Sequence, residues 1–315
     1  MDTTEVISQS IKKANSISIW SKLADNERVV AYLFILPSLI GFVVFYAVPA
    51  VRSLFISFSQ WNLLSDPTYV GGANYQKLFA DSRFWQSLGV TIRYVAWNIP
   101  FQTAIALFVA VMMDRIHNSS FLRGIMILPW LVPNVVVALL WLWLLDPSLG
   151  IVNVGLQAIG LPKQPFLGST EQAIIGIAGI NIWRYTGYTA IIIFAGLKAI
   201  PKSLYDAAAI DGANDMEQFW QITLPLLKPV LFFVLVTSVV GSFQIFDTIA
   251  VTTAGGPAGA TRVIIYYIWD QVFNRGNNMG MATAASVVLF LILITATIIQ
   301  MRILRANRSE LADYS

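Results

Sequence analysis

The sequence contains no cysteine, a single histidine (His117), and no lysine that follows a glycine. Without cysteine the chain can form no disulfide bond, thiolate metal site or cysteine nucleophile, and one histidine cannot build a multi-histidine metal centre. A Walker A sequence needs Gly-Lys before Ser or Thr, so that backbone amides and the lysine can bind phosphate. The chain therefore cannot hydrolyse ATP through a P-loop, and we expect it to bind no cofactor or metal of its own.

Charged residues are also scarce. They make up 12% of the 315 residues, whereas hydrophobic residues make up 57% and the mean hydropathy is +0.67. A soluble globular domain carries about 25% charged residues, so this composition indicates an integral membrane protein. The net charge of +3 is too small to indicate nucleic-acid binding.

Windows without charge locate the membrane spans, because a spanning helix needs about 20 apolar residues. Six windows of 18 to 26 residues are free of charge apart from Arg184. Pro129 and Pro133 leave open whether the third span is continuous, and the apolar run 263–269 is too short to span and is expected to form an interfacial or surface helix. The sequence predicts an all-α integral membrane protein with six transmembrane helices, at about 29–55, 87–113, 121–145, 172–197, 229–254 and 280–303.

The basic residues predict the orientation, since cytoplasmic loops carry more Lys and Arg than outer loops. With both termini inside, 12 of the 20 basic residues fall on the cytoplasmic side. We therefore expect cytoplasmic tails at 1–28 and 304–315, a transmembrane domain at 29–303 and a long cytoplasmic loop at 198–228. The first 28 residues have no apolar stretch typical of a signal peptide, so we expect no cleaved leader.

The loop 198–228 carries a pattern that a simple connector does not need. Ser203 is placed to cap a short helix that contains the alanines 207–209, and Gly212 allows a sharp turn into a second short segment. Small residues that end at a glycine turn suit close packing into a cleft of a partner protein. A surface helix-turn-helix connector is the alternative that composition alone leaves open.

This string resembles the EAA loop of permease subunits of binding-protein-dependent ABC importers. The family pattern is Glu-Ala-Ala, three residues, a glycine, about nine residues and then Ile-x-Leu-Pro. At those places the chain has Asp206-Ala207-Ala208, Gly212 and Ile222-Thr223-Leu224-Pro225. Asp206 is the one departure, a shorter carboxylate in place of glutamate. The chain is similar to the maltose and carbohydrate-uptake branch over residues 30–305, through Tyr205, Asp211, Ala213, Phe219 and Gly255-Gly256-Pro257.

The resemblance implies a non-catalytic permease subunit of an ATP-driven importer. It would form half of the translocation pathway for a sugar or sugar derivative that an extracytoplasmic binding protein delivers. The implied partners are that protein, a second homologous permease in a heterodimer, two ATPase subunits that hold ATP and Mg²⁺, and the lipid bilayer of the bacterial cytoplasmic (inner) membrane. The loop 198–228 would dock into the ATPase as a coupling helix, through Tyr205, Asp206, Ala207, Ala208, Asp211, Gly212, Ala213, Phe219, Leu224 and Pro225.

Polar residues inside the predicted spans are candidates for the substrate pathway, because polar groups in hydrocarbon tend to face the bundle interior or a water-filled path. In the fourth span Asn181, Tyr185 and Tyr188 share one helix face, and the fifth span repeats the same i, i+4, i+7 spacing. Sugars need hydrogen-bonding groups and aromatic faces, and the resemblance places both stripes at sugar-contacting positions. Interhelical hydrogen bonding is the alternative role. The predicted pathway residues are Asn181, Arg184, Tyr185, Tyr188, Ser238, Ser242, Gln244 and Ile245.

Two charges and three amides in the spans allow several roles. Three roles are open for Arg184: it lines the pathway, forms an ion pair with Asp247, or extends toward the membrane interface. Asn98, Gln102 and Asn134 are weaker pathway candidates. A stand-alone secondary transporter of small polar solutes is the alternative function, but ion-coupled transporters usually carry more ionisable groups in the membrane. A membrane-embedded enzyme would need a catalytic constellation, and one histidine without clustered acids supplies none.

Overall fold

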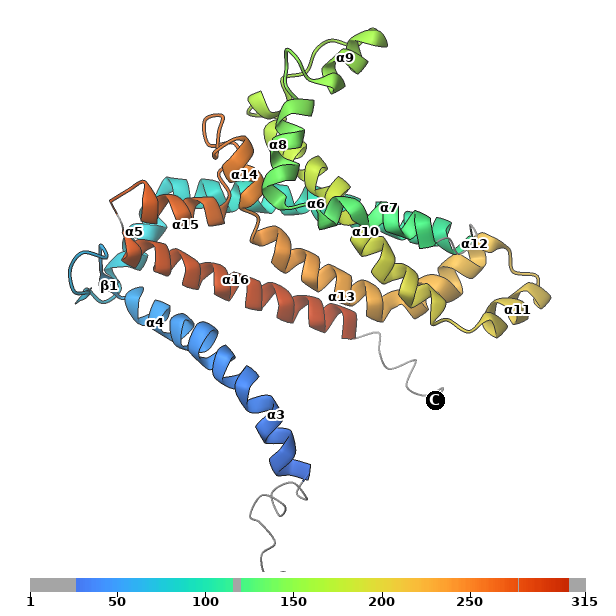
Figure 1. Cartoon of the computed structure of the whole chain (residues 1–315), viewed down its shortest axis with the longest axis horizontal. Helices are drawn as coiled ribbons and strands as arrows, with labels where there is room; N and C mark the ends of the chain where they lie inside the picture. Colours follow the sequence, from blue (N-terminus) through green and yellow to red (C-terminus); the bar gives the residue numbers. More distant parts are fainter. Residues whose placement is uncertain (1–26, 116–119, 277, 306–315) are drawn as a thin grey trace, which may run out of the picture. The chain divides into compact units, whose positions relative to one another are not determined.

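The structure, a computed structural model, describes residues 27–115, 120–276 and 278–305. The regular secondary structure of the described residues is helical apart from one antiparallel pair of short strands, β1 (Ser59–Gln60) and β2 (Thr68–Tyr69). It divides into two compact units at Ile56 (Figure 1). The predicted cytoplasmic tails lie outside the described residues except for 27–28 and 304–305, which are helical, and His117 lies outside them altogether.

The first unit is a run of helix formed by α3 (Glu27–Phe42), the π turn η1 (Val43–Ala47) and α4 (Val48–Ile56). It confirms the helix expected at 29–55. Its apolar side chains lie on all sides and stay exposed within the chain, with Phe34 82% and Phe45 75% exposed. A helix that is apolar all round is suited to a hydrocarbon environment.

Four long helices dominate the second unit and confirm helices at or near four predicted spans. α10 packs against both α6 and α13, and α13 also packs against α16. In Figure 1 these helices run roughly side by side. The helices are α6 (Ser82–Arg115), α10 (Ala173–Lys198), α13 (Leu224–Phe243) and α16 (Met279–Arg305).

Two predicted spans are interrupted. The third consists of α7 (Ser120–Leu131) and α8 (Asn134–Leu144), bent by 91° at the break. Pro133 accounts for this break, because it lacks an amide hydrogen and disfavours helix in the residue before it. The fifth, predicted at 229–254, lies within the apolar run Asp215–Thr252, which a short non-helical turn divides into α13, ending at Phe243, and α14 (Asp247–Thr252).

The described residues include four helical runs that are long and apolar enough to cross a membrane: Arg28–Ile56, Ser82–Asp114, Asp215–Thr252 and Met279–Ile303. The bent pair α7–α8 would make a fifth if it acts as one span. α10 is long enough but carries Asn181 and Arg184 near its centre, which lowers its hydropathy. The structure thus confirms a multi-span helical protein, while the count of six stays a prediction.

Short helices connect these long ones. The surface helix expected at 263–269 is present as α15 (Ile264–Phe273), and it packs against α6 and α16. Within the loop 198–228 lie α11 (Lys202–Ile210), α12 (Asp215–Gln218) and the π turn η3 (Phe219–Thr223). The remaining short elements are α5 (Ala73–Ala80), α9 (Ile151–Ala158) and the 3₁₀ turn η2 (Phe166–Gly168).

The two π turns share a sequence cause. η1 ends two residues before Pro49, and η3 ends two residues before Pro225. A proline inside a helix clashes with the carbonyl one turn earlier and offers that carbonyl no hydrogen. The wider π turn lets the helix continue past the proline, as such bulges do elsewhere. In η3 the π turn joins α12 directly to α13, so the chain stays helical from the loop 198–228 into α13.

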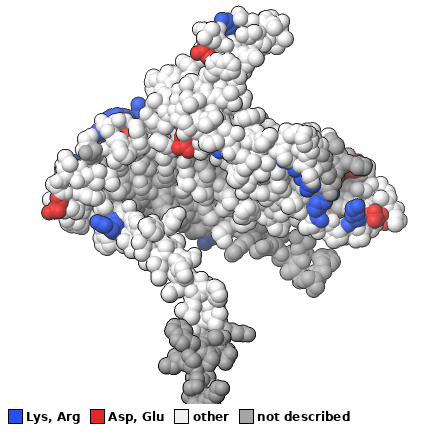
Figure 2. Space-filling model, in the orientation of Figure 1, with Lys and Arg blue, Asp and Glu red and all other residues white. Residues whose placement is uncertain are grey.

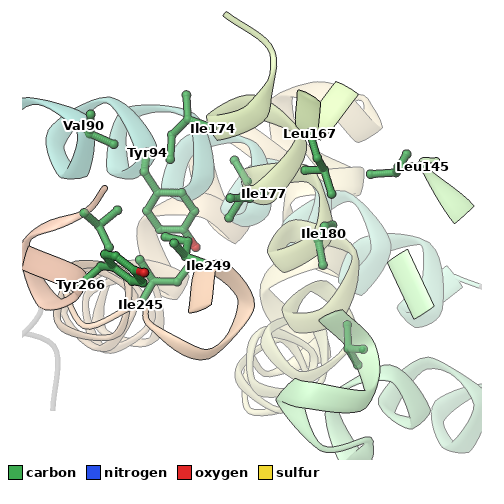
Figure 3. Packing of buried hydrophobic residues seen from close by; sticks show 13 residues of the cluster. Val90, Tyr94, Leu145, Leu167, Ile174, Ile177, Ile180, Ile245, Ile249 and Tyr266 are labelled. Carbon is green, nitrogen blue, oxygen red and sulfur yellow. The ribbon is translucent and has the colours of Figure 1, made fainter. Parts of the chain in front are cut away.

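Buried apolar residues hold the second unit together around α6 and α10. Figure 3 shows the ring of Tyr94 among Ile174 and Ile177 of α10 and Ile245 and Ile249 of the α13–α14 segment. Close packing of helix backbones also stabilises this unit, at positions where the side chains are small. A Cβ at Gly187 of α10 would lie 1.8 Å from the backbone oxygen of Met126 in α7, so α7 and α10 can approach this closely only with glycine.

Candidate functional site

A polar cavity of about 340 Å³ lies among α6, α10, α13 and the turn that leads into α14. Its volume falls in the range of small-molecule sites. The wall combines amides, hydroxyls and aromatic rings with a few apolar side chains. The lining residues are Tyr94, Asn98, Gln102, Asn134, Asn181, Tyr185, Tyr188, Thr189, Ile192, Phe233, Val234, Thr237, Ser238, Gly241, Ser242, Gln244, Ile245, Phe246, Asp247 and Thr248.

Every predicted pathway residue except Arg184 lines this cavity. Asn181, Tyr185 and Tyr188 reach it from one face of α10, as their helical spacing predicts. Ser238 and Ser242 come from α13, and Gln244 and Ile245 come from the non-helical turn that follows it. The structure thus brings the two predicted stripes together, while their contact with a substrate stays a prediction.

Sequence reasoning missed part of the wall. Tyr94 stands four residues before Asn98 and eight before Gln102, and all three line the cavity from α6. That i, i+4, i+8 spacing was a readable signal for Tyr94. The apolar members had no such signal, because Ile192, Phe233, Val234 and Phe246 resemble ordinary span residues.

Hydrogen bonds across the cavity wall link three helices. Asn98 Nδ2 donates to Ser242 Oγ at 3.0 Å and to Gln102 Oε1 at 3.3 Å. Gln102 Nε2 in turn donates to Thr189 Oγ1 at 3.0 Å. These bonds connect α6 to α13 and to α10, so part of the wall also serves as interhelical hydrogen bonding. Asn98 Oδ1 is buried and has no hydrogen-bond partner among the described residues.

Arg184 points away from the cavity, toward the break between α7 and α8. Its Nη2 donates to the backbone oxygens of Trp130, at 3.2 Å, and Val132, at 2.8 Å. Its Nη1 donates to the Tyr185 hydroxyl at 3.3 Å, and the guanidinium lies over that ring. The last carbonyl oxygens of a helix have no hydrogen-bond donors within that helix. Arg184 therefore supplies donors to backbone oxygens that lack them at the break. Arg184 thus does not line this cavity, and its place in the pathway stays a prediction.

Asp247 forms its hydrogen bond with an amide rather than with Arg184. Asn134 Nδ2 donates to Asp247 Oδ2 at 2.6 Å. Asn134 is the first residue of α8, and Asp247 is the first residue of α14. This bond joins the starts of the two helices, which also pack against each other.

One aromatic pair borders the cavity. The Tyr188 ring stacks on Trp130 of α7, with centroids 4.6 Å apart and an interplanar angle of 11°. Tyr188 keeps 36% of its surface exposed. The pair therefore presents a flat aromatic surface, of the kind that packs against the apolar face of a sugar ring.

The loop 198–228 has the predicted helix, turn and helix. α11 ends in a Schellman motif, in which Ala213 N donates to Ala208 O at 2.9 Å and Gly212 N donates to Ala209 O at 3.1 Å. Gly212 has φ +85°, which confirms the sharp turn. The expected cap at Ser203 was wrong, because α11 begins at Lys202 after Pro201, and proline is favourable around a helix start.

Much of this loop is exposed within the chain. Asp206, Ala207, Asp211 and Gly212 are exposed, and Ile210 keeps 86% of its surface. The remaining residues predicted to contact the ATPase are partly buried: Tyr205, Ala208, Ala213, Phe219, Leu224 and Pro225.

Internal contacts fix the base of the loop. The hydroxyls of Tyr205 and Thr223 lie 2.9 Å apart, so α11 is tied to the end of η3. Asn214 and Glu217 form a reciprocal capping box at the start of α12.

A second cavity of about 500 Å³ adjoins this loop. Its charged lining residues are Asp114, Lys198, Lys202, Asp206 and Asp215. In the face shown in Figure 2, charged side chains gather mainly toward the ends of the long helices, with few between them.

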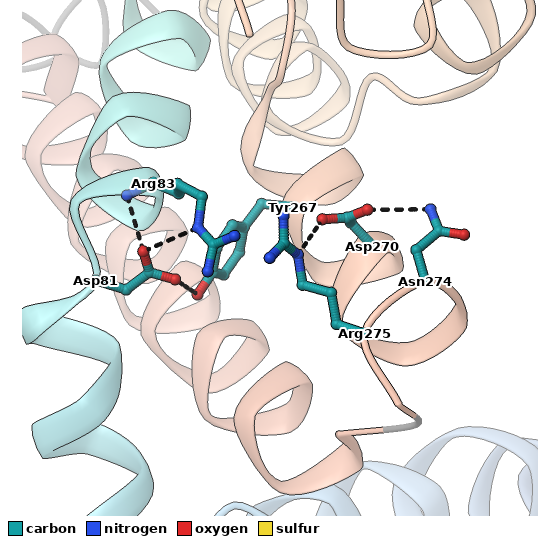
Figure 4. A network of polar contacts seen from close by, with 6 residues as sticks. All are labelled: Asp81, Arg83, Tyr267, Asp270, Asn274 and Arg275. Carbon is teal, nitrogen blue, oxygen red and sulfur yellow. Dashed lines mark hydrogen bonds and ion pairs between the residues drawn. The ribbon is translucent and has the colours of Figure 1, made fainter.

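A polar network ties the start of α6 to α15 (Figure 4), at the end of the bundle away from this loop (Figure 1). Asp81 accepts hydrogen bonds from Arg83 N at 2.9 Å, from Arg83 Nε at 3.3 Å and from the Tyr267 hydroxyl at 3.0 Å. Burial raises the pKa of Asp81, but these hydrogen bonds and the Arg83 charge outweigh it and leave the pKa below its usual value. In the same network Asp270 binds Arg275 and Asn274.

Comparison with known proteins gives a consistent picture. The profile of the family described as "Binding-protein-dependent transport system inner membrane component" matches residues 102–309, which include most of the cavity wall and the whole loop 198–228. The chain is 33% identical over 293 residues to the trehalose/maltose transport system permease protein MalF of Thermococcus litoralis, covering 92% of this chain and 99% of that protein.

Two further relatives support the same grouping. The chain is 34% identical over 281 residues to the sn-glycerol-3-phosphate transport system permease protein UgpA of Agrobacterium fabrum, covering 88% of this chain and 94% of that protein. A chain from the crystal structure of a bacterial ABC transporter involved in the import of the acidic polysaccharide alginate has a TM-score of 0.79 at 24% identity, covering 91% of this chain and 98% of that one. That structural likeness shows a shared fold.

Proposed function

The chain belongs to the family of inner membrane components of binding-protein-dependent transport systems, and from this membership we propose that it forms half of the translocation pathway for a sugar or sugar derivative. The observation that carries the substrate class is the cavity of about 340 Å³ in an otherwise apolar helical bundle. Polar groups are costly in a bilayer and mark substrate pathways when they face a shared cavity.

The chemistry of the wall suits a polyhydroxylated ligand. Asn181, Ser238 and Gln244 offer side-chain amides or a hydroxyl, and each of these groups can both donate and accept a hydrogen bond. Tyr185 and Tyr188 add aromatic faces on the same side of α10. The amides and the hydroxyl of this wall suit the hydroxyl groups of a sugar, and the aromatic rings suit its apolar ring faces.

The topology that follows has six spans with both termini in the cytoplasm. In this arrangement α10 is a polar span that is shielded by α6, α7 and α13, which all pack against it. The loop 198–228 then lies in the cytoplasm, and the α9 region and the Asp81–Tyr267 network lie outside. The excess of Lys and Arg on the cytoplasmic side supports this orientation.

The partners follow from the loop 198–228 and from family membership. We propose a heterodimer with a second homologous permease, two ATPase subunits with bound ATP and Mg²⁺, and an extracytoplasmic binding protein, all at a bacterial cytoplasmic membrane. The exposed face of α11, with Asp206, Ala207 and Ile210, supports docking of the ATPase there. No residue of this chain takes a catalytic role in the proposal.

The test is uptake of labelled sugars by cells that express the complete transporter and lack other uptake routes. We expect uptake of at least one sugar that requires this chain and stops when the partner ATPase carries an inactive P-loop. A transporter that moves no carbohydrate under these conditions, or that continues without ATP hydrolysis, would contradict the proposal.

A further inference from the structure

The hydrogen bonds that start from two amides of α6 run in one direction through the cavity wall. Asn98 Nδ2 donates to Ser242 Oγ of α13 and to Gln102 Oε1, and Gln102 Nε2 donates to Thr189 Oγ1 of α10. All four side chains line the cavity, and none is more than 5% exposed. Asn98 and Gln102, the α6 amides, thus each supply a hydrogen to a hydroxyl on a neighbouring helix.

The direction of this chain of bonds follows from the Asn98 amide. Both hydrogens of its Nδ2 are used, one in each bond, whereas its Oδ1 is buried without a partner among the described residues. Turning the α6 amides over would instead leave this nitrogen and both of its hydrogens without acceptors. Unpaired buried donors cost free energy, and unpaired N–H groups are rarer in proteins than unpaired carbonyl oxygens. The described direction is therefore the favourable one.

The hydroxyls of Ser242 and Thr189 accept these bonds and keep their own hydrogens. A hydroxyl has one hydrogen and two lone pairs. Within the described residues, neither Ser242 Oγ nor Thr189 Oγ1 donates its hydrogen to another group. Each hydrogen is therefore available to the contents of the cavity. The bond from the amide also makes the hydroxyl a stronger donor, because linked hydrogen bonds polarise one another.

We propose that the α6 amides position the hydroxyls of Ser242 and Thr189 as donors, so that the cavity selects a ligand with acceptor oxygens at these two places. The inference rests on the proposed transport function and adds the direction of two of its hydrogen bonds. Asn98 and Gln102 are positioning residues, because they act on the ligand through the two hydroxyls.

The alternative role of these bonds is to hold three helices together. In that role the direction of each bond is immaterial, and the hydroxyl hydrogens could equally point toward the amides. The two roles separate when the direction is reversed and the bonds are kept.

Asn98→Asp reverses the chain of bonds with little change in shape. A carboxylate accepts hydrogen bonds and donates none, so the Ser242 hydroxyl should turn its hydrogen toward residue 98. The Gln102 amide should turn over to donate to the same carboxylate, and Thr189 then donates to Gln102 Oε1. Assays at pH 8 favour the ionised carboxylate, since burial raises the pKa of a carboxyl group.

Gln102→Glu is the matched control, the same chemical change four residues along one face of α6. It reverses the Thr189 bond alone, because Asn98 still donates to residue 102 and to Ser242. Ser242→Ala and Thr189→Val each remove one hydroxyl and show which part of the sugar that hydroxyl contacts.

The experiment measures uptake by cells that express the complete transporter and lack other uptake routes. The parent probes are maltose and trehalose, joined by any other sugar that enters through this chain. Each is compared with its monodeoxy derivatives, which lack one hydroxyl, and with its monodeoxyfluoro derivatives, in which fluorine accepts a hydrogen bond but donates none. Because these probes are uncharged, a new carboxylate affects a deoxy and a fluoro derivative alike apart from this bond.

In the original protein we expect sugar positions at which the fluoro derivative competes for uptake at least about threefold better than the deoxy derivative. Asn98→Asp should lower this ratio to about one at each of them. Gln102→Glu should preserve the ratio at the position that Ser242→Ala identifies and abolish it at the position that Thr189→Val identifies.

A ratio near one at every position in the original protein would overturn the positioning role, and so would an Asn98→Asp variant that keeps the preference. In both cases the parent sugars still enter the cells, and the proposed transport function stands. If the Asn98→Asp protein does not accumulate in the membrane, Gln102→Glu decides, because a preference that persists at the Thr189 position contradicts the role. If no carbohydrate enters through this chain, the transport function fails, and the positioning role fails with it.

Discussion

At the residue scale, Arg184 shows how a charge inside a helical bundle can serve the fold. Its guanidinium reaches two backbone oxygens at the α7–α8 break and lies over the Tyr185 ring. A sequence shows that an arginine inside a span is unusual, but it does not show in which direction the side chain points. The choice among pathway, ion pair and interface therefore needed the position of α7, which depends on tertiary packing.

We predict that Arg184→Met lowers the stability of the purified protein by about 1–3 kcal/mol, because the partly buried backbone oxygens of Trp130 and Val132 lose their donors. Methionine keeps the length of the side chain, and Arg184→Lys serves as a control that retains one donor group. Thermal unfolding in detergent measures the loss. An unchanged melting temperature together with altered substrate choice would return Arg184 to the pathway.

The lowered pKa of Asp81 gives a prediction about the response of its polar network to acid. Its pKa in the folded protein lies below the usual 3.8, so its ionised form favours the folded state. This contribution is present above pH 3.8 and is lost as the pH falls through the lower folded-state pKa. Thermal unfolding measured from about pH 6 to pH 3 should show less loss on acidification in Asp81→Asn than in the original protein.

The matched control for Asp81 is Asp66→Asn, in the segment between β1 and β2. It should keep the acid sensitivity of the original protein. If Asp81→Asn and Asp66→Asn behave alike, the contacts with Arg83 and Tyr267 do not govern the acid response.

At the element scale, the helices were predictable where one rule decided them. Charge-free windows located α6, α10 and α16, because long apolar stretches leave few alternatives in a chain of this composition. The turn at Gly212 was also readable, since its pattern requires a residue that tolerates positive φ. The end of α13 at Phe243 was not, because the nearest glycine, Gly241, lies inside the helix and no proline follows before Pro257.

The contact between α7 and α10 gives a prediction about these two elements. Gly187→Ala should destabilise the protein by about 1–3 kcal/mol, because the added methyl would meet Met126 O and force the helices apart. Gly179→Ala in the same helix is the matched control, since a Cβ there meets nothing within 4 Å. Equal melting temperatures for the two variants would show that α7 and α10 do not approach each other as closely as described.

The loop 198–228 gives a prediction about coupling. Gly212→Val should distort the turn, since most residues are strained at φ +85°, and Asp206→Lys should reverse the charge on the exposed face of α11. We expect each variant to insert into the membrane but to retain at least about tenfold less ATPase on co-purification and to lose uptake. Asp206→Glu should be tolerated, because it keeps the charge. Full uptake by both disruptive variants would make this loop a simple connector.

At the scale of the whole molecule, the topology can be tested with the cysteines that the sequence lacks. Lys163→Cys, in the loop between α9 and η2, should react with a membrane-impermeant maleimide added to intact cells. Lys202→Cys, at the start of α11, should react only after the membrane is opened. The unaltered chain has no cysteine and provides the background. Labelling at position 202 in intact cells would reverse the proposed orientation.

The joint between α10 and α11 has a mechanical consequence. α10 runs unbroken from Ala173 to Lys198, a rod of about 39 Å, and α11 starts after three residues that end in Pro201. Proline fixes its own φ, so the joint has little slack. A displacement of α11 would therefore be passed along α10 to the residues that line the cavity. Because Arg184 donates to Trp130 O in α7 and to Val132 O in the α7–α8 break, such a displacement of α10 would also reach the α7–α8 segment.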